Sequence, residues 1–167
     1  MLENEKPKPT TKRIGGYLHK IVPILDSTGK VIHHVVKPFM VELKPRDILQ
    51  IIIGATILAI PVAFTEEVWQ LSIKLPKLNI GILALTSIIF ISLFVYFNFY
   101  RFHLKEYKLD FIKRVLAIYF ISLLIVCFLL IIIGQCPLIS NFGVAIKRII
   151  IVTFPSSMSA SVSDLIK

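Results

Sequence analysis

Long apolar stretches alternate with short charged ones over most of this chain. Residues 48–65, 78–100 and 115–146 contain no charged side chain. A helix of about 20 apolar residues is enough to cross the hydrocarbon core of a bilayer. Gly134 and Pro137 divide the last stretch into a helix and a loop. The pattern predicts transmembrane helices over residues about 47–69, 78–100 and 112–133.

A fourth span is predicted over residues about 141–165, where the composition is mixed. Ile149–Phe154 is apolar, but the residues that follow are mostly small and polar, and Lys147 and Arg148 stand just before it. The segment is long enough to cross, and its small polar side chains indicate shielding by the other helices. An amphipathic helix lying on the membrane surface is the alternative.

The first 44 residues have a different pattern. Residues 1–13 are polar and contain proline, which predicts a disordered tail. Residues 14–44 contain short β-branched runs on both sides of Asp26–Lys30, a sequence typical of a hairpin turn. The predicted fold is therefore an all-α membrane protein, with four transmembrane helices in residues 45–167 and a small N-terminal cytoplasmic β-hairpin-like cap.

The composition excludes a soluble domain. Of the 167 residues, 56% are hydrophobic, and the mean hydropathy is +0.80, so the expected partner of the chain is a lipid bilayer. The net charge of +9 does not indicate nucleic-acid binding, because the basic residues flank the apolar spans, where topology explains them. No cleavable signal peptide is expected, since residues 1–20 lack an apolar core.

The distribution of basic residues predicts the orientation. The segment before the first span holds nine Lys and Arg residues and the loop 101–114 holds five, whereas residues 134–146 hold none. Cytoplasmic loops carry the excess of Lys and Arg. We therefore expect a multi-pass protein of the cell membrane with both termini in the cytoplasm.

Enzyme motifs are absent from the sequence, so no catalytic residue, cofactor or metal site is predicted. Gly15-Gly16 does not form a phosphate-binding loop, and Cys127 and Cys136 lack zinc spacing. His33 and His34 are adjacent in a predicted strand, so their rings point to opposite faces and cannot bind one metal together.

The first candidate site is the end of the first span. Thr65, Glu66, Glu67 and Trp69 stand there, and carboxylates at a membrane boundary need water, a partner charge or a bound cation. A ring of such acids around the symmetry axis of a homo-oligomer would select cations. One alternative is an ion-pair clasp with Lys147 and Arg148 as charge partners, in which Trp69 is only an interfacial anchor. The other is plain solvation of the acids at the interface.

The second candidate is the serine-rich run in the fourth span. Small residues spaced by three or four positions let helices approach closely, and their hydroxyl groups form hydrogen bonds across the contact. A polar pathway that ends at Asp164 is the functional alternative to this packing. The residues of this candidate are Ser156, Ser159, Ser163 and Asp164.

These two stretches resemble an uncharacterised family of prokaryotic integral membrane proteins, domain of unknown function 2391. Its members end the first span in Thr-Met-Glu-x-Trp-Trp, and Thr65, Glu67 and Trp69 match this motif. Glu66 replaces the methionine and Gln70 the second tryptophan. A Phe-Pro, small-residue and Asp run matches Phe154–Asp164. The resemblance covers about residues 45–165, implies a membrane protein and supplies no mechanism.

Three functions fit these features. The first is an oligomeric cation channel or small transporter with its carboxylate site at the outer end of the first span, which requires a homo-oligomer. The second is a non-transporting scaffold or sensor whose cytoplasmic cap binds a partner. The third is an intramembrane enzyme acting on lipid, for which only Asp164 beside Ser161 and Ser163 provides candidate residues; we expect a non-enzymatic protein.

Overall fold

The computed structural model of the chain describes residues 10–14, 17–26, 31–38, 42–101, 104 and 107–166. The chain divides into two compact units, Met1–Glu42 and Leu43–Lys167. The first is a small sheet and the second a helical bundle.

The first unit is an antiparallel sheet in the order β1-β2-β3, formed by Thr10–Ile14, Tyr17–Leu25 and Val31–Pro38. Pro23 lies beyond Ile21, the last β2 residue that pairs with β1, so β2 is an edge there, and strands accept proline at an edge. The predicted hairpin strands are confirmed, while residues 27–30 of the predicted turn lie outside the described residues.

The prediction of a disordered tail over residues 1–13 is wrong for residues 10–13. Thr10–Ile14 forms strand β1, with Thr10 opposite Ile21 and Ile14 opposite Tyr17. The strand forms because its backbone groups pair with β2, and two consecutive β-branched threonines favour the extended conformation. Residues 1–9 lie outside the described residues.

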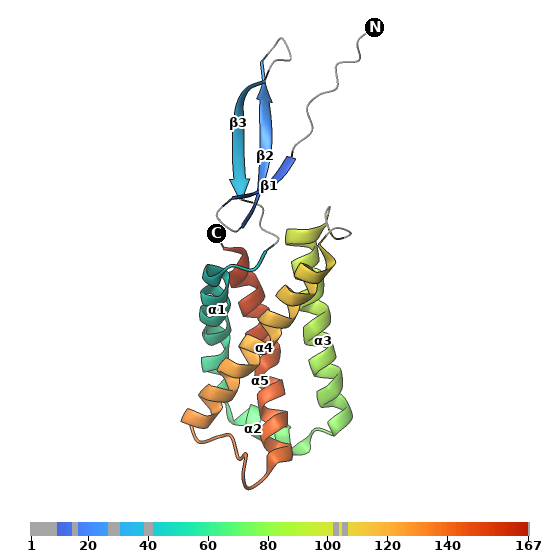
Figure 1. Cartoon of the computed structure of the whole chain (residues 1–167). Helices are drawn as coiled ribbons and strands as arrows, with labels where there is room; N and C mark the ends of the chain where they lie inside the picture. Colours follow the sequence, from blue (N-terminus) through green and yellow to red (C-terminus); the bar gives the residue numbers. More distant parts are fainter. Residues whose placement is uncertain are drawn as a thin grey trace. The chain divides into compact units, whose positions relative to one another are not determined.

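Among its described residues, the second unit contains four helices that are long and apolar enough to cross a membrane. They run alternately up and down the bundle (Figure 1). A short helix, α2, follows α1, and a π-helical turn, η1, continues α3. The elements are α1 Pro45–Ala63, α2 Glu66–Lys74, α3 Lys77–Val95, η1 Tyr96–Tyr100, α4 Lys108–Ile132 and α5 Phe142–Leu165.

The outer surface of the bundle is apolar. Ile53, Leu124 and Phe128 are each at least 60% exposed, and such side chains occur along all four long helices. Exposed apolar side chains carry no free-energy cost when lipid, and not water, surrounds them. The chain is therefore an integral membrane protein, as the sequence predicts.

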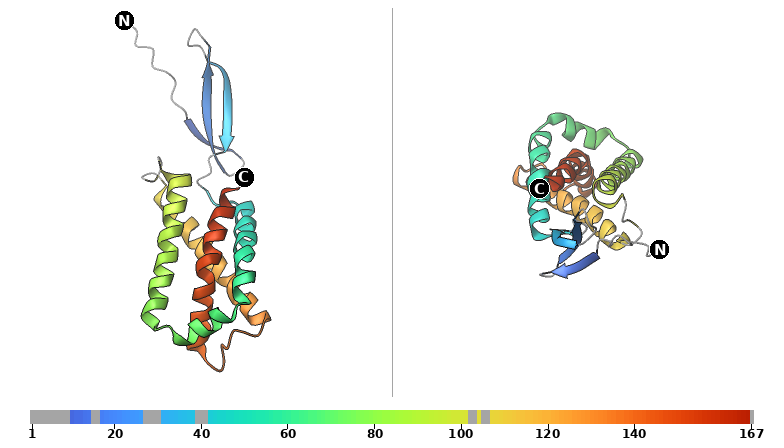
Figure 2. Two further views of the ribbon diagram at one scale, coloured as in Figure 1. Left: turned by 180° about the vertical axis from the view of Figure 1, so that it is seen from behind. Right: turned by 90° about the horizontal axis from the view of Figure 1, so that it is seen from above.

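Helix α5 is the central element of the bundle. It packs against α1, α2, α3 and α4, and the view from above shows these helices around it (Figure 2). Its contact with α1 is very close: a Cβ atom on Gly54 would lie 2.9 Å from both Ala160 Cα and Ser159 O, and it would also clash with Ser163 Cβ. Small residues permit this approach.

The predicted first span is wrong at its end. Helix α1 stops at Ala63, and Thr65 has an extended backbone with φ −88° and ψ 134°. Helix α2 then begins at Glu66 and lies across the end of the bundle between α1 and α3 (Figure 1). Acidic residues favour a helix N-terminus, so Glu66 and Glu67 mark a new helix and not the last turn of the span.

Candidate ion-binding site

The site lies at the end of the bundle where α1 and α4 begin and α5 ends, called here the Arg114 end. Asp47 is in the first turn of α1 and Asp164 in the last turn of α5. Arg114 is the seventh residue of α4, roughly 9 Å along the helix from Lys108. Because the helices alternate in direction, residues far apart in the sequence meet at this end.

Arg114 forms ion pairs with both carboxylates. Its Nη2 lies 2.8 Å from Asp47 Oδ2, and its Nε lies 2.8 Å from Asp164 Oδ2. A further hydrogen bond of 3.3 Å runs from Nη2 to Asp164 Oδ1, so the pairing with Asp164 is bidentate. One guanidinium group therefore joins α1, α4 and α5.

The cluster is shielded from its surroundings. The exposed fractions of Arg114, Asp47 and Asp164 are 0%, 2% and 0%. The ring of Phe99 lies under the guanidinium group, 4.1 Å from its Cζ, and the Lys44 backbone N–H donates a hydrogen bond to Asp47 Oδ2. Charges taken out of water cost several kcal/mol each unless they are paired and hydrogen-bonded, as these are.

A row of hydroxyl groups leads along α5 toward this cluster. Thr153, Ser156, Ser157 and Ser161 are all at most 4% exposed, and their spacing places them on one helix face together with Asp164. Ser156 donates to Ala55 O of α1, whereas the other three donate to carbonyl groups of α5. Each hydroxyl oxygen also has lone pairs that can accept a proton or contact a cation. We call these four residues the hydroxyl row.

Arg148 lies at the α2 end of the bundle, separated from Thr153 by the apolar residues 149–152. Its Nη1 donates to Gln135 O and Gln135 Oε1, both at 2.8 Å, and its Nε donates to Ser72 Oγ at 3.2 Å. Lys147 donates to Leu75 O at 2.6 Å. Both of these basic side chains thus have neutral partners.

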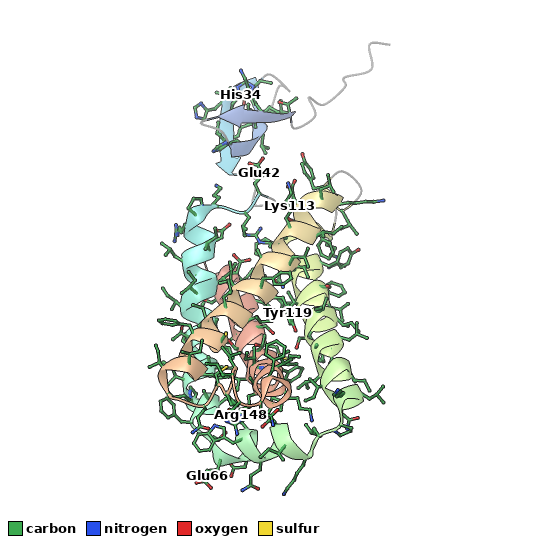
Figure 3. All side chains as sticks on the ribbon, turned by 60° about the horizontal axis from the view of Figure 1, so that its bottom comes forward. His34, Glu42, Glu66, Lys113, Tyr119 and Arg148 are labelled. Atoms are coloured by element: carbon green, nitrogen blue, oxygen red, sulfur yellow. The ribbon has the colours of Figure 1, made fainter. Side chains whose placement is uncertain are left out.

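The predicted clasp between these basic residues and the acids of α2 is not formed. Glu66 and Glu67 are exposed, and within the described residues neither carboxylate forms an ion pair or hydrogen bond. Glu66 points away from the bundle, whereas Arg148 lies among the helices (Figure 3). The acids turn outward because α2 is a separate helix with its first turn at the surface. Their role in an ion pathway stays a prediction.

Thr65 and Trp69 hold the junction between α1 and α2. The Thr65 hydroxyl donates to Val62 O at 2.8 Å, and the Trp69 indole N–H donates to Ala63 O at 3.2 Å. Both bonds satisfy carbonyl groups at the end of α1 that have no partner within the helix. In the folded chain these two side chains stabilise a turn.

The serine-rich run packs against α1, as one of the two sequence interpretations expects. Ser156 forms a hydrogen bond across the contact, and Ser159 and Ser163 lie beside Gly54. Asp164 pairs with Arg114. Helix α5 therefore packs closely against α1 and also carries the row of polar side chains.

Sequence analysis missed Arg114 and Asp47. Arg114 was counted among the basic residues of a loop, although Val115–Ile133 continues directly from it without a charge. Asp47 is not among the residues that the sequence singled out. An arginine inside the predicted helix of the third span was the available signal, because such a residue needs an acidic partner in the bundle.

No group of three or more His, Cys, Asp or Glu side chains suited to a metal ion occurs in the part of the chain that the structure describes. Cys127 and Cys136 are free thiols. The ion pairs of the cluster join two carboxylates and one guanidinium group.

Comparison with protein families identifies the family of the chain. The family described as "Putative integral membrane protein (DUF2391)" matches residues 27–166. The chain belongs to this family. The match includes strand β3 as well as the bundle, so it begins earlier than the resemblance noted from residue 45. Comparisons with curated proteins and with solved structures gave no match.

Proposed function

We propose that the protein transports a monovalent cation across the membrane and that Asp47, Arg114 and Asp164 form the binding site. The observation that supports this proposal is the burial of two carboxylates around one guanidinium group inside a membrane bundle. Ionisable residues in membrane segments are costly and characteristically belong to ion pathways and proton relays. Of the monovalent cations that such a site could bind, the proton is the smallest.

The carboxylate oxygens of the cluster suit a cation. An ionised carboxylate accepts protons and hydrogen bonds, and carboxylates are the groups that select cations in membrane pathways. In this proposal the cluster alternates between a loaded and an unloaded state.

The hydroxyl row supplies the part of the route nearest the cluster in this proposal. It begins at Thr153 and ends at Ser161, a rise of roughly 12 Å for eight residues of helix, and Asp164 follows one turn later. Hydroxyl oxygens can replace part of the hydration shell of a cation or relay a proton.

Orientation and assembly are part of the proposal. The basic residues before α1 and between α3 and α4 support a cytoplasmic Arg114 end and therefore cytoplasmic termini at the cell membrane. A homo-oligomer would arrange the Glu66 and Glu67 carboxylates around an axis, as predicted above. The transport step requires no catalytic residue, in line with a non-enzymatic protein.

Flux through proteoliposomes tests the proposal. The purified chain is reconstituted, an ion gradient of H⁺, Na⁺ or K⁺ is imposed in separate arms, and uptake is followed with an ion-sensitive dye. We expect one cation to move, and Asp164→Asn to reduce its flux at least about tenfold, in line with a lost charge-assisted contact. Absence of flux for all three ions would refute the transport function.

Asp110→Asn is the matched control. Asp110 is a carboxylate in the first turn of α4 at the same end of the bundle, and its side chain is partly exposed. We expect its flux to match that of the wild-type chain. Equal flux in Asp164→Asn and Asp110→Asn, with both variants monodisperse in detergent, would remove the cluster from the pathway.

A second candidate function is partner binding by the sheet. Ile32 and Val36 are 66% and 48% exposed, and alternation along β3 places both on one face. Ile21, opposite Val36, extends this apolar face onto β2. Full-length chain and its Ile32→Lys variant can be purified from native membranes and compared by mass spectrometry. A co-purified protein lost only in the variant would favour the scaffold or sensor hypothesis.

A further inference from the structure

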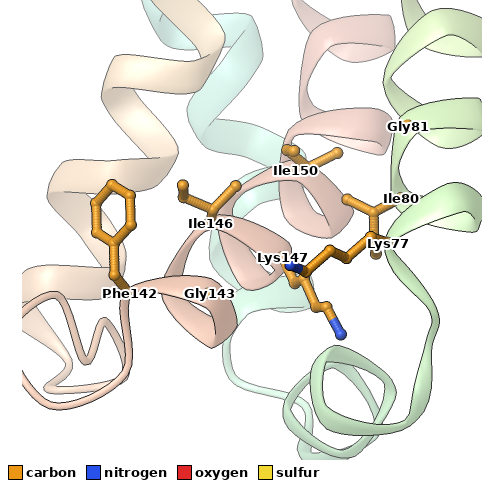
Figure 4. A pocket seen from close by; sticks show the side chains of 8 residues that line it. All are labelled: Lys77, Ile80, Gly81, Phe142, Gly143, Ile146, Lys147 and Ile150. Carbon is orange, nitrogen blue, oxygen red and sulfur yellow. The ribbon is translucent and has the colours of Figure 1, made fainter.

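The groove between α3 and α5 at the α2 end of the bundle has a composition suited to a lipid. Its volume is about 430 Å³, within the range of pockets that bind small molecules. The groove has an apolar wall and two lysine side chains. It is lined by Lys77, Ile80, Gly81, Phe142, Gly143, Ile146, Lys147 and Ile150 (Figure 4).

We propose that this groove binds one anionic phospholipid, with the phosphate group at Lys77 and Lys147 and an acyl chain along the isoleucines. The site is separate from the Asp47–Arg114–Asp164 cluster, and the proposal does not depend on cation transport.

The two lysines provide the charge complementarity. Lys77 is the first residue of α3, and Lys147 lies in the second turn of α5. Both side chains lie between the two helices at the same end of the groove (Figure 4). One ammonium hydrogen of Lys147 is used by Leu75 O; an ammonium group has three. Basic pockets between transmembrane helices bind anionic headgroups for this reason.

Two glycines keep the groove open. A Cβ atom on Gly81 would meet no atom within 4 Å, and one on Gly143 would meet only Asn141 Oδ1, at 3.7 Å. The neighbouring side chains are Ile80, Ile146 and Ile150, which match a hydrocarbon chain. The open space therefore begins beside the charged groups and continues over apolar ones, in the order of a phospholipid headgroup and tail.

A second copy of this chain fits the groove less well. The same groove on a two-fold related copy would bring its own lysines toward Lys77 and Lys147, and like charges repel. A zwitterionic lipid would fill the apolar part and gain little from the lysines. An anionic phospholipid satisfies both parts.

Native mass spectrometry of the delipidated full-length chain tests the proposal. The chain is titrated with phosphatidylglycerol and, separately, with phosphatidylcholine of identical acyl chains. We expect one phosphatidylglycerol to bind at least about fivefold more tightly, because each basic residue near a lipid headgroup contributes a factor of that order. Equal binding of the two lipids would overturn the proposal, as would dimers that exclude lipid from the groove.

Three variants locate the bound lipid. Lys77→Gln, which leaves the hydrogen bond of Lys147 to Leu75 intact, is expected to lower the preference for phosphatidylglycerol about fivefold. Gly81→Leu, which projects a side chain into the open space while both lysines remain, is expected to weaken both lipids. Lys74→Gln is the control, since Lys74 is an exposed lysine at the end of α2 that does not line the groove. An equal loss in Lys74→Gln and Lys77→Gln would show nonspecific charge attraction and contradict the site.

Discussion

Arg114 and Arg148 are two arginines of one membrane bundle with opposite surroundings. Arg114 is fully buried and paired with two carboxylates. Arg148 is half-buried, and its recorded partners are the neutral oxygens of Gln135 and Ser72. A guanidinium group that is cut off from water needs opposite charge, whereas one near the end of a bundle can be stabilised by dipoles and by solvent.

In the transport proposal, this difference assigns ion binding to the Arg114 end. At the Arg114 end, a cation could join carboxylates that are already gathered and buried. At the α2 end, the carboxylates of Glu66 and Glu67 are exposed, and the buried polar groups surround an arginine. The bundle therefore has an acidic site at one end and a basic, lipid-accessible region at the other.

Replacing each arginine tests this comparison and should give the largest difference in stability. Arg114→Leu leaves two buried carboxylates without their guanidinium partner, and loss of one partner from a buried ion pair costs about 3–5 kcal/mol. We expect a large fall in the thermal unfolding midpoint in detergent, measured by scanning fluorimetry.

Arg148→Leu is the matched variant. Its neutral partners lose hydrogen bonds but keep no uncompensated charge, so the midpoint should fall by less than half as much. If the two variants were equally unstable, the buried charges at the Arg114 end would have no special contribution to the fold.

The contact between α1 and α5 brings Asp47 and Asp164 to the same guanidinium group, and Gly54 tests it. A Cβ atom at Gly54 would clash with the Ala160 backbone and with Ser163, and overpacking of this kind costs about 1–3 kcal/mol. Gly54→Ala should therefore lower the unfolding midpoint. Gly81→Ala, with open space at its Cβ, should leave the midpoint unchanged or raise it slightly through helix propensity.

The junction at the α2 end should be less sensitive. Trp69→Phe removes the hydrogen bond from the indole N–H to Ala63 O, and one such bond contributes about 1 kcal/mol. We expect a small fall in stability by circular dichroism, smaller than that of Gly54→Ala. A larger fall would show that the position of α2 determines the packing of the whole bundle.

The smallest expected effect is on the labelling rate of the Cys136 thiol, which depends on the nearby charge of Arg148. Burial raises the pKa of the Cys136 thiol, Cys127 beside it adds to the rise, and the positive charge of Arg148 opposes it. Because only the thiolate reacts, maleimide labelling should be slow at neutral pH and should accelerate at a higher pH than for an exposed cysteine.

Peptide mapping after timed labelling measures this rate for Cys136 alone. Arg148→Leu removes the opposing charge and should move the labelling profile further toward alkaline pH. A profile that matched an exposed cysteine would contradict the burial of this loop.

The membrane class and the number of spans could be predicted because they depend on local composition. An uncharged run of about 20 residues forms a helix in lipid whatever its neighbours are. The span ends were less predictable: the break at Phe64–Thr65 depends on how α2 packs across the bundle, and the sequence alone does not distinguish a last turn of the span from a new helix at Glu66.

The candidate site could be predicted only in part, because its residues come from distant parts of the sequence. Asp164 could be identified as the end of a polar face of one helix, since the periodicity of the serines is local. Its partner Arg114 and the second carboxylate, Asp47, lie 50 and 117 residues away in sequence, and their meeting depends on helix order around α5. The expected pairing of Glu66 and Glu67 with Lys147 and Arg148 failed on the same ground, because similar depth in the membrane does not specify the direction of a side chain.

Access of water to the hydroxyl row tests the central proposal most directly. In a background of Cys127→Ser and Cys136→Ser, Ser157→Cys and Val162→Cys are reconstituted and exposed to a small charged methanethiosulfonate. Ser157 is buried in the row, whereas Val162 is 50% exposed on the apolar surface. If cations move along α5, Ser157→Cys should be modified and Val162→Cys should remain unmodified in the lipid. Protection of Ser157→Cys under the same conditions that produce flux would contradict the route and, with it, the delivery of an ion to Asp47, Arg114 and Asp164.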